Sequence, residues 1–149
     1  MNQPAPRSVD TIVVHCSATR GSQDIGRAEI DRWHRERGFS GVGYHYIIRR
    51  DGQLELGRPE AQIGAHAAGH NARSIGICLV GGLNEQLRAT NNFTREQWDT
   101  LTRVLEDVRT RYPAARILGH RDLPNVRKDC PCFDVRGWCA QHGIDPEPR

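Results

Sequence analysis

The stretch Thr11-Ile-Val-Val-His15-Cys16 decides the fold, because a run of β-branched residues ends in two residues that can carry chemistry. Such a run is typical of a buried strand, and its end places His15 where the strand leaves the sheet. A second apolar run, Ser74-Ile-Gly-Ile-Cys-Leu-Val80, predicts a central strand that Gly81-Gly82 ends. These two runs predict the interior of a β-sheet.

Further strands and helices alternate around these two runs. Residues 44–50 and 53–56 read as two strands joined by the tight turn Asp51-Gly52, and residues 116–119 as a short strand. Within a strand over 44–50, Tyr44 and Tyr46 would point to the same side. Helical patterns predict helices over 27–37, 95–111 and 135–142. The helix over 95–111 is preceded by a capping box, Thr94-Arg-Glu-Gln97.

Length and order of elements together predict one α/β domain, a central mixed β-sheet flanked by helices. The chain has 149 residues, which suits a single domain with a core over about residues 9–142 and a short polar arm and tail. No run approaches the ~20 apolar residues of a membrane helix, so we expect no membrane insertion. The segment Met1–Asp10 lacks the apolar centre of a signal peptide. We therefore expect synthesis in the cytoplasm.

The charge is mildly basic and is carried almost wholly by arginine. The formal net charge is +3, and Lys128 is the one lysine among 21 basic residues. A compact ammonium differs chemically from a guanidinium, so a single lysine is a candidate for a specific role, with a chance surface position as the alternative. Because no basic stripe interleaved with aromatics occurs, nucleic acid is not an expected partner.

Five cysteines without a secretion signal argue against a disulfide framework and favour metal binding, catalysis or burial. Cys78 lies within an apolar strand, Cys16 should face away from its neighbour His15, and Cys139 lies on the last predicted helix. These three are interpreted as small buried residues. Cys130 and Cys132 lie together in a loop, where either could bind a metal.

His15, His120 and Cys130 all lie where predicted elements end. A catalytic zinc ion takes three protein ligands from histidine, cysteine or carboxylate and keeps a fourth position for water. These three residues could form such a site, although isolated histidines are more often structural. Lys128, two residues before Cys130, could then stabilise an oxyanion beside the metal. Tyr44 could orient the water or share that oxyanion, with half-buried packing as the alternative.

The stretch 57–73 is a long loop rich in Gly, Ala and His, and loops of this length are usually functional. It contains His66, His70 and Asn71. Small residues there would let the backbone approach a ligand, so we predict substrate contacts from His66 and Asn71, and from His45 near the hairpin. A solvated surface loop is the alternative.

Six motifs occur in order across residues 9–142, and together they resemble one family. They are Val-His15-Cys-Ser-Ala-Thr, Val42-Gly-Tyr44-His-Tyr-Ile-Ile, Arg50-Asp-Gly52, Ser74-Ile-Gly-Ile-Cys-Leu-Val-Gly-Gly82, Gly119-His120-Arg-Asp and Cys130-Pro-Cys-Phe-Asp134. The chain resembles the zinc-dependent N-acetylmuramoyl-L-alanine amidases of the amidase-2 family. The likeness is greatest to phage endolysins of the T-seven lysozyme type, and it extends at fold level to peptidoglycan recognition proteins.

The resemblance implies one Zn²⁺ ion held by His15, His120 and Cys130, with Tyr44 and Lys128 at the catalytic positions. It implies a cleft histidine in substrate contact at His66. Cys132 stands where a serine often does, which leaves the choice between the two cysteines to the Cys-Pro-x-Phe-Asp frame.

Resemblance also implies a biological setting. The substrate would be peptidoglycan, and a phage or prophage endolysin would reach the wall through a holin-like route. We expect a monomer. A peptidoglycan-binding module without activity is the main alternative, although such receptors commonly lack the cysteine ligand. Some phage members also bind the phage RNA polymerase, which makes that polymerase a second candidate partner.

Overall fold

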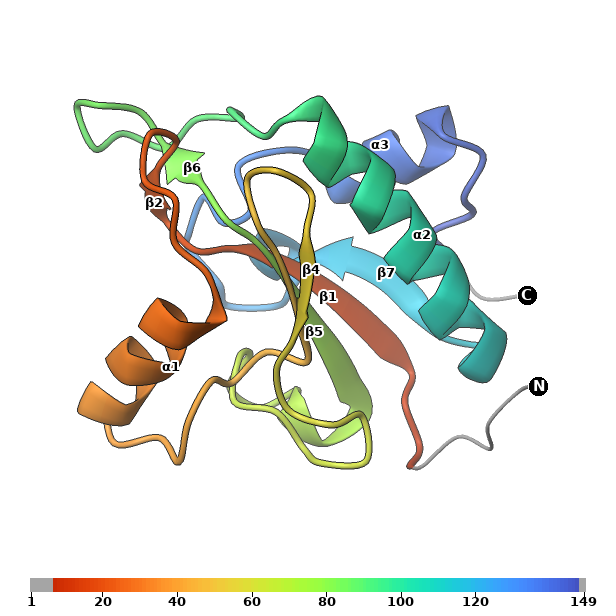
Figure 1. Cartoon of the computed structure of the whole chain (residues 1–149). Coiled ribbons are helices and arrows are strands. Elements are labelled where there is room, and N and C mark those ends of the chain that lie inside the picture. The colour runs from red at the N-terminus through yellow and green to blue at the C-terminus, as the bar shows by residue number, and fades with distance from the viewer. Residues whose placement is uncertain (1–6, 148–149) are drawn as a thin grey trace.

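A computed structural model describes residues 7–147 of the chain. It contains a five-stranded sheet in the order β4-β3-β5-β1-β7 and a two-stranded sheet of β2 and β6. Residues 1–6 of the predicted arm and residues 148–149 of the predicted tail lie outside the described residues. The elements follow in chain order (Figure 1): β1 Thr11–Cys16, β2 Thr19–Arg20, α1 Arg27–Glu36, β3 Tyr46–Ile48, β4 Leu54–Leu56, η1 Asn71–Arg73, β5 Ser74–Leu79, β6 Gly82–Leu83, α2 Arg95–Arg111, β7 Arg116–Gly119, η2 His120–Asp122 and α3 Val135–Gln141.

Strand β1 lies between β5 and β7 and runs parallel to both. Strand β3 adds to the other edge of β5 in parallel, and β4 returns antiparallel through the hairpin. The predicted mixed sheet is therefore confirmed. Parallel pairing places the carboxyl ends of β1 and β7 at the same edge of the sheet, and these ends are followed by the residues of greatest chemical interest.

One face of the sheet is closed by α2 and α3. Helix α2 begins with the predicted capping box, in which the side chains of Thr94 and Gln97 bond each other's backbone. Its apolar positions repeat at helical spacing and pack on alternate residues of the strands. The larger core cluster includes Ile12, Val14, Ile75, Ile77, Ile117, Leu101, Leu105, Val108 and Val135.

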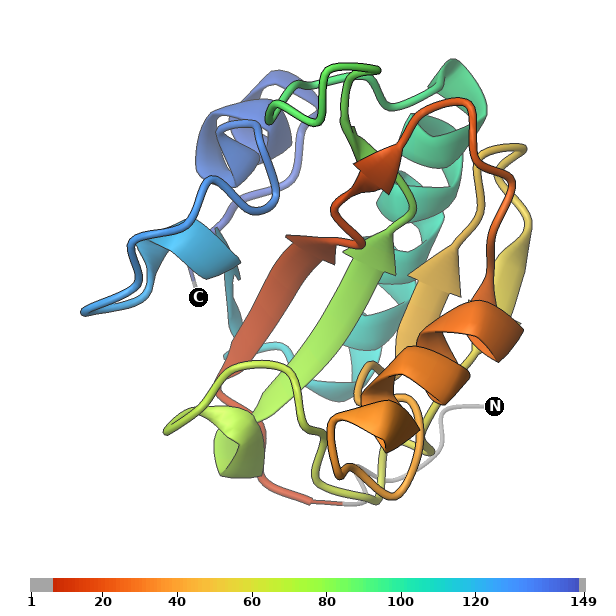
Figure 2. The same ribbon diagram turned by 90° about the vertical axis from the view of Figure 1, so that its left-hand side faces the viewer.

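The opposite face is covered by α1 and by two loops. Ile30 and His34 of α1 are buried, and Ile30 packs in a cluster with Ile47 and Cys78 of the sheet. Figure 2 views this face, with α1 on one side of β1 and β5 and the loop after β7 on the other. Because side chains alternate along β1, Val13 and His15 point to this face, while Val14 joins the larger core.

Two features of the fold differ from the sequence prediction. The short strands β2 and β6 were not predicted, because two residues each give no periodicity to detect. Strand β3 begins at Tyr46 rather than at residue 44. The prediction that Tyr44 and Tyr46 share a side is therefore wrong: Tyr44 packs with the α1 cluster and Tyr46 with the α2 cluster, because strand alternation does not reach back to Tyr44.

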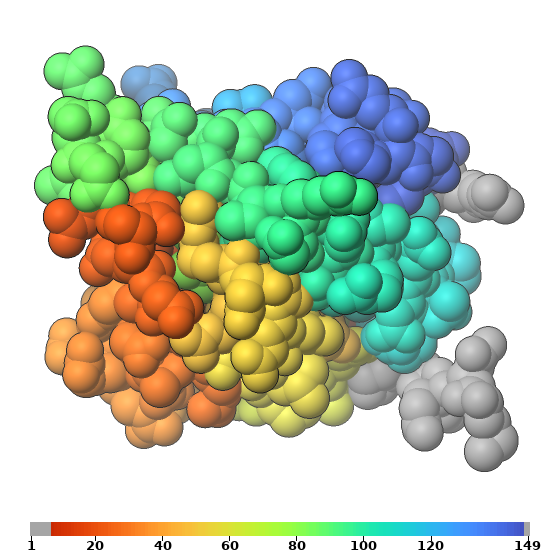
Figure 3. All heavy atoms as spheres, turned by 45° about the horizontal axis from the view of Figure 1, so that its top comes forward, coloured from red at the N-terminus to blue at the C-terminus, as the bar shows by residue number. Residues whose placement is uncertain are grey.

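The β3–β4 hairpin lies at the surface between α1 and α2, as the gold atoms of Figure 3 show. Leu54 and Leu56 on β4 are 39% and 66% exposed. Within residues 7–147, no helix combines the length and the hydropathy needed to cross a bilayer.

Candidate metal centre

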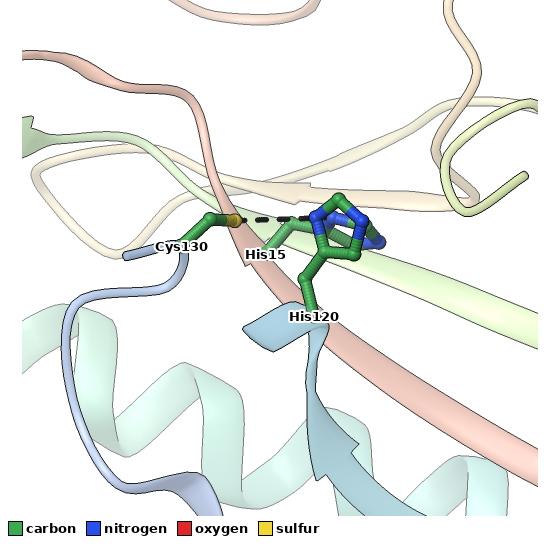
Figure 4. A group of neighbouring side chains, drawn as sticks. All are labelled: His15, His120 and Cys130. Carbon is green, nitrogen blue, oxygen red and sulfur yellow. Dashed lines mark hydrogen bonds between the residues drawn. The ribbon is translucent and has the colours of Figure 1, made fainter. Parts of the chain in front are cut away.

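Three donor side chains meet at the carboxyl ends of β1 and β7. His15 belongs to β1, His120 directly follows β7, and Cys130 lies in the loop beyond η2. One ligand atom from each lies within 4.8 Å of the other two. Figure 4 shows the three side chains pointing toward one another, with Cys130 Sγ 4.0 Å from His15 Nδ1. The structure thus brings together the residues that the sequence predicted as a metal site.

Backbone contacts fix Cys130 at this position. The Arg121 N–H donates to the Cys130 carbonyl at 2.9 Å, which closes the loop onto the end of β7. The Cys16 N–H, at the end of β1, donates to Cys130 Sγ at 3.2 Å. This backbone N–H, which points at the sulfur, holds the Cys130 side chain beside the two histidines.

The donor set fits a zinc ion. Zinc takes imidazole nitrogen at ~2.0–2.1 Å and thiolate sulfur at ~2.3 Å in tetrahedral geometry, so a bound nitrogen and sulfur lie about 3.5 Å apart. The 4.0 Å separation of His15 Nδ1 and Cys130 Sγ is close to that spacing. His120 and Cys130 are partly exposed, so solvent can reach the cluster.

Cys132 is oriented differently from Cys130. Its Sγ lies 3.4 Å from the Gly82 carbonyl and 4.0 Å from Cys16 Sγ, on the side of β6. Burial, with the Cys16 thiol beside it, raises the pKa of Cys132 to about 12. Because the Cys132 sulfur contacts Gly82 and Cys16 whereas the Cys130 sulfur lies with the two histidines, the geometry favours Cys130 as the ligand. Cys16, Cys78 and Cys139 are buried, as the sequence predicted.

Burial keeps the cluster histidines neutral. It lowers the pKa of His15 well below the ordinary value, and the neighbouring His66 lowers it further. It also lowers the pKa of His120, with a second contribution from the charge of Lys128. A neutral imidazole offers a lone pair to a metal. Lys128 lies on the same exposed loop, two residues before Cys130.

Tyr44 lies against the cluster. The centroid of its ring is 5.1 Å from that of His15. Burial raises the pKa of Tyr44 well above its ordinary value, and the Cys78, Cys130 and Cys16 sulfurs raise it further. The phenol therefore keeps its proton at neutral pH and can act as a hydrogen-bond donor.

The long loop brings His66 to the cluster and leaves His70 outside it. His66 Nδ1 lies 2.8 Å from His15 Nε2. Asn71 shapes the loop, because its Oδ1 accepts from the backbone N–H groups of His66 at 2.9 Å and Ala67 at 2.8 Å. The contact of Asn71 with the protein backbone indicates a loop-ordering role, and its contact with substrate stays a prediction.

His45 is 1% exposed and is held by the protein on both ring nitrogens. Its Nδ1 accepts from the Gly76 N–H at 3.0 Å, and its Nε2 lies 2.9 Å from the Gln62 carbonyl. This arrangement favours packing of the 57–73 loop on β5. The predicted contact of His45 with substrate stays a prediction, and the burial of the ring argues against it.

His45 should make the fold sensitive to acid. Burial lowers its pKa from 6.5 to about 4, so between these values the unfolded chain binds more protons than the folded chain. This contribution to stability is complete above pH 6.5 and is lost as the pH falls toward 4. From pH 8 to 5 we expect the unfolding free energy to fall on the order of 2 kcal/mol.

Urea titrations of the unaltered chain and of His45→Gln at both pH values measure this effect. Loss of metal at low pH is common to the two proteins and cancels in the comparison. Equal pH dependence in the two would show that His45 titrates normally in the folded chain.

Sequence reasoning missed two residues that support this site. Ser74 Oγ lies 3.2 Å from His66 Nε2, and Gly76 leaves room for the His66 ring. Both lie on β5 and, by alternation, face the same side as His15. The polar and small residues at alternate positions of an apolar run, Ser74 and Gly76, were the signal that could have indicated them.

A cluster of two imidazoles and a thiolate, set at the ends of parallel strands and open to solvent, is the arrangement of a metallohydrolase site. The family model for N-acetylmuramoyl-L-alanine amidase matches residues 5–133. The endolysin of Enterobacteria phage K11 is 46% identical over 125 residues, covering 84% of this chain and 82% of the relative. The endolysin of Escherichia phage T7 is 45% identical over 142 residues, covering 95% and 93%.

Structural comparison agrees with the sequence comparison. The N-acetylmuramoyl-L-alanine amidase LysC from Clostridium intestinale matches with a TM-score of 0.78 at 28% identity, covering 97% of this chain and 92% of that one. The chain belongs to the N-acetylmuramoyl-L-alanine amidase family and is an amidase. The family resemblance and fold class predicted from the sequence are confirmed.

Proposed function

We propose that this amidase cleaves the amide bond between N-acetylmuramic acid and L-alanine in peptidoglycan, with one zinc ion held by His15, His120 and Cys130. The observation that carries the proposal is the convergence of these donors from three separate segments within 4.8 Å. Membership of the amidase family supports the identity of the bond that is cleaved. The relatives named endolysin support a role in lysis of a bacterial host by a phage or prophage.

His15, His120 and Cys130 would hold the zinc ion, which would supply an activated water as the nucleophile at neutral pH. Lys128 is the one lysine of the chain and lies in the same loop as Cys130, and we assign it the stabilisation of the oxyanion that forms on the attacked carbonyl. Tyr44 keeps its proton and is assigned the orientation of the attacking water or a hydrogen bond to the same oxyanion.

Mass spectrometry of purified peptidoglycan tests the reaction. After incubation with the protein we expect stem peptides with free L-alanine N-termini. A zinc chelator should abolish them, and added zinc should restore them. New reducing sugar ends would instead indicate a glycosidase. An uncut wall that retains the protein in a pull-down would favour the binding-module alternative.

Tyr44→Phe removes one hydroxyl and leaves the ring that packs on His15. We expect turnover to fall by about 10²-fold, the lower range for loss of one oxyanion donor, with zinc content unchanged. Turnover of soluble muropeptide and metal analysis of the same sample measure both quantities. Tyr46→Phe is the matched control, since Tyr46 packs on the other face of the sheet. Full activity of Tyr44→Phe would contradict the role assigned to the hydroxyl.

Three further predictions rest on the resemblance to phage endolysins. They are a monomeric state and passage to the wall through a holin-like route, with the phage RNA polymerase as a candidate second partner in the alternative that the protein also regulates transcription. The two endolysins compared above support a protein that acts on the cell wall.

A further inference from the structure

The two ring nitrogens of His15 have different neighbours. Nδ1 lies 4.0 Å from Cys130 Sγ, within the metal cluster. Nε2 lies 2.8 Å from Nδ1 of His66. The two imidazole rings meet edge to face, with centroids 4.9 Å apart. One nitrogen of His15 thus faces the metal position, and the other contacts His66.

His66 is held in turn on its far side. Its Nε2 lies 3.2 Å from the hydroxyl oxygen of Ser74, a residue with no exposed surface at the start of β5. Both nitrogens of His66 therefore have partners inside the protein. His15, His66 and Ser74 form a continuous chain of hydrogen-bonding groups from the metal cluster to the sheet.

The position of the His66 ring is set by the backbone beneath it. A Cβ atom at Gly76 would lie 2.6 Å from the ring, so only glycine lets the imidazole lie this close to β5. Asn71 holds the backbone of His66, because Asn71 Oδ1 accepts a hydrogen bond from the His66 N–H at 2.9 Å. A residue held at its ring and its backbone is suited to orienting a neighbour.

We propose that His66 is a positioning residue for the metal ligand His15 and that Ser74 fixes His66 for this role. The inference rests on the proposed function, since it takes the cluster to hold zinc. A ligand nitrogen must carry a lone pair, so binding through Nδ1 requires the proton of His15 on Nε2, where it is donated to His66 Nδ1. His66 then carries its own proton on Nε2 and donates to Ser74 Oγ.

The reverse direction of these hydrogen bonds is incompatible with metal binding. If Ser74 donated to His66 and His66 to His15, the proton of His15 would lie on Nδ1, the nitrogen that faces Cys130. His66 and Ser74 therefore select the tautomer of His15, as carboxylates and carbonyls do for histidine ligands in many metal sites. This role differs from the substrate contact that the sequence predicted for His66.

Zinc affinity measures the effect directly, without reference to activity. We expect His66→Phe, which keeps an aromatic ring but removes the acceptor, to weaken zinc binding about 10- to 100-fold in a titration against a competing chelator. Ser74→Ala removes one oxygen from a residue that no substrate can touch and should weaken binding about fivefold, the effect of one ordinary hydrogen bond. His70→Phe, in the same loop but outside the cluster, should leave the affinity unchanged.

Kinetics at saturating zinc separate positioning from substrate contact. A positioning role predicts that kcat of Ser74→Ala recovers as zinc is added, with KM unchanged. Two results together would overturn the inference. They are zinc affinity unaltered in both His66→Phe and Ser74→Ala, and a KM of His66→Phe that stays raised at all zinc concentrations. Failure of the unaltered chain to bind zinc would defeat the proposed function as well. The melting temperature of each variant in chelator reports whether the fold is kept.

Discussion

Cys130→Ala should lose both zinc and activity. The unaltered chain is expected to carry about one zinc ion, and removal of the thiolate leaves two imidazoles, too few for the three protein ligands of a catalytic site. Amidase turnover should fall at least ~10³-fold, because the activated water and the polarised carbonyl disappear together. Metal analysis after gel filtration and muropeptide turnover on the same sample measure the two effects.

Cys132→Ser is the matched control for this substitution. Cys132 lies two residues away, and its sulfur contacts Gly82 and Cys16 rather than the histidines. Serine at this position should therefore keep zinc content and turnover near those of the unaltered chain. The opposite pattern, with tight zinc in Cys130→Ala and none in Cys132→Ser, would identify Cys132 as the ligand.

Lys128→Ala should separate chemistry from metal binding. Loss of one group that stabilises an oxyanion typically costs roughly 10²–10³ in turnover, whereas Lys128 is not among the three donors. We therefore expect slow turnover with full zinc content. The same measurements on Arg127→Ala, which removes a neighbouring exposed cation of the same loop, control for net charge.

Lys128→Arg sharpens this test. Arginine keeps the charge but spreads it over a planar fork, so partial recovery would indicate that charge matters more than the compact ammonium. Full activity in Lys128→Ala would contradict the oxyanion role, and loss of zinc would show that the lysine maintains the cluster instead.

The metal cluster could be predicted because its residues lie at element ends that are visible in the sequence. His15 ends a β-branched run and His120 follows the short strand Arg116–Gly119, and parallel strands bring such ends together. Cys130 is less predictable from spacing, because its position depends on a loop whose path is set by contacts such as Arg121 N–H to the Cys130 carbonyl. The family motif Cys130-Pro-Cys-Phe-Asp134, and not periodicity, indicated Cys130 as the third ligand.

Side-chain partners beyond the cluster could not be predicted from the sequence. Alternation along the 74–80 run could place Ser74 on the same side of the sheet as His15, but its contact with His66 depends on how the 57–73 loop folds back over β5. The prediction that Tyr44 and Tyr46 point to the same side was wrong for a related reason. Side chains alternate only inside a strand, and β3 begins later than its apolar pattern suggests. Periodicity predicts helices and strands, whereas most of the site residues lie at strand ends and in the loops that follow them.

The contact between Cys16 and Cys130 joins residues 114 positions apart. Any fragment that stops before residue 130 therefore lacks one of the three donors of the proposed zinc site. We expect such a fragment to leave peptidoglycan uncut, because two imidazoles alone are too few protein ligands for a catalytic zinc ion.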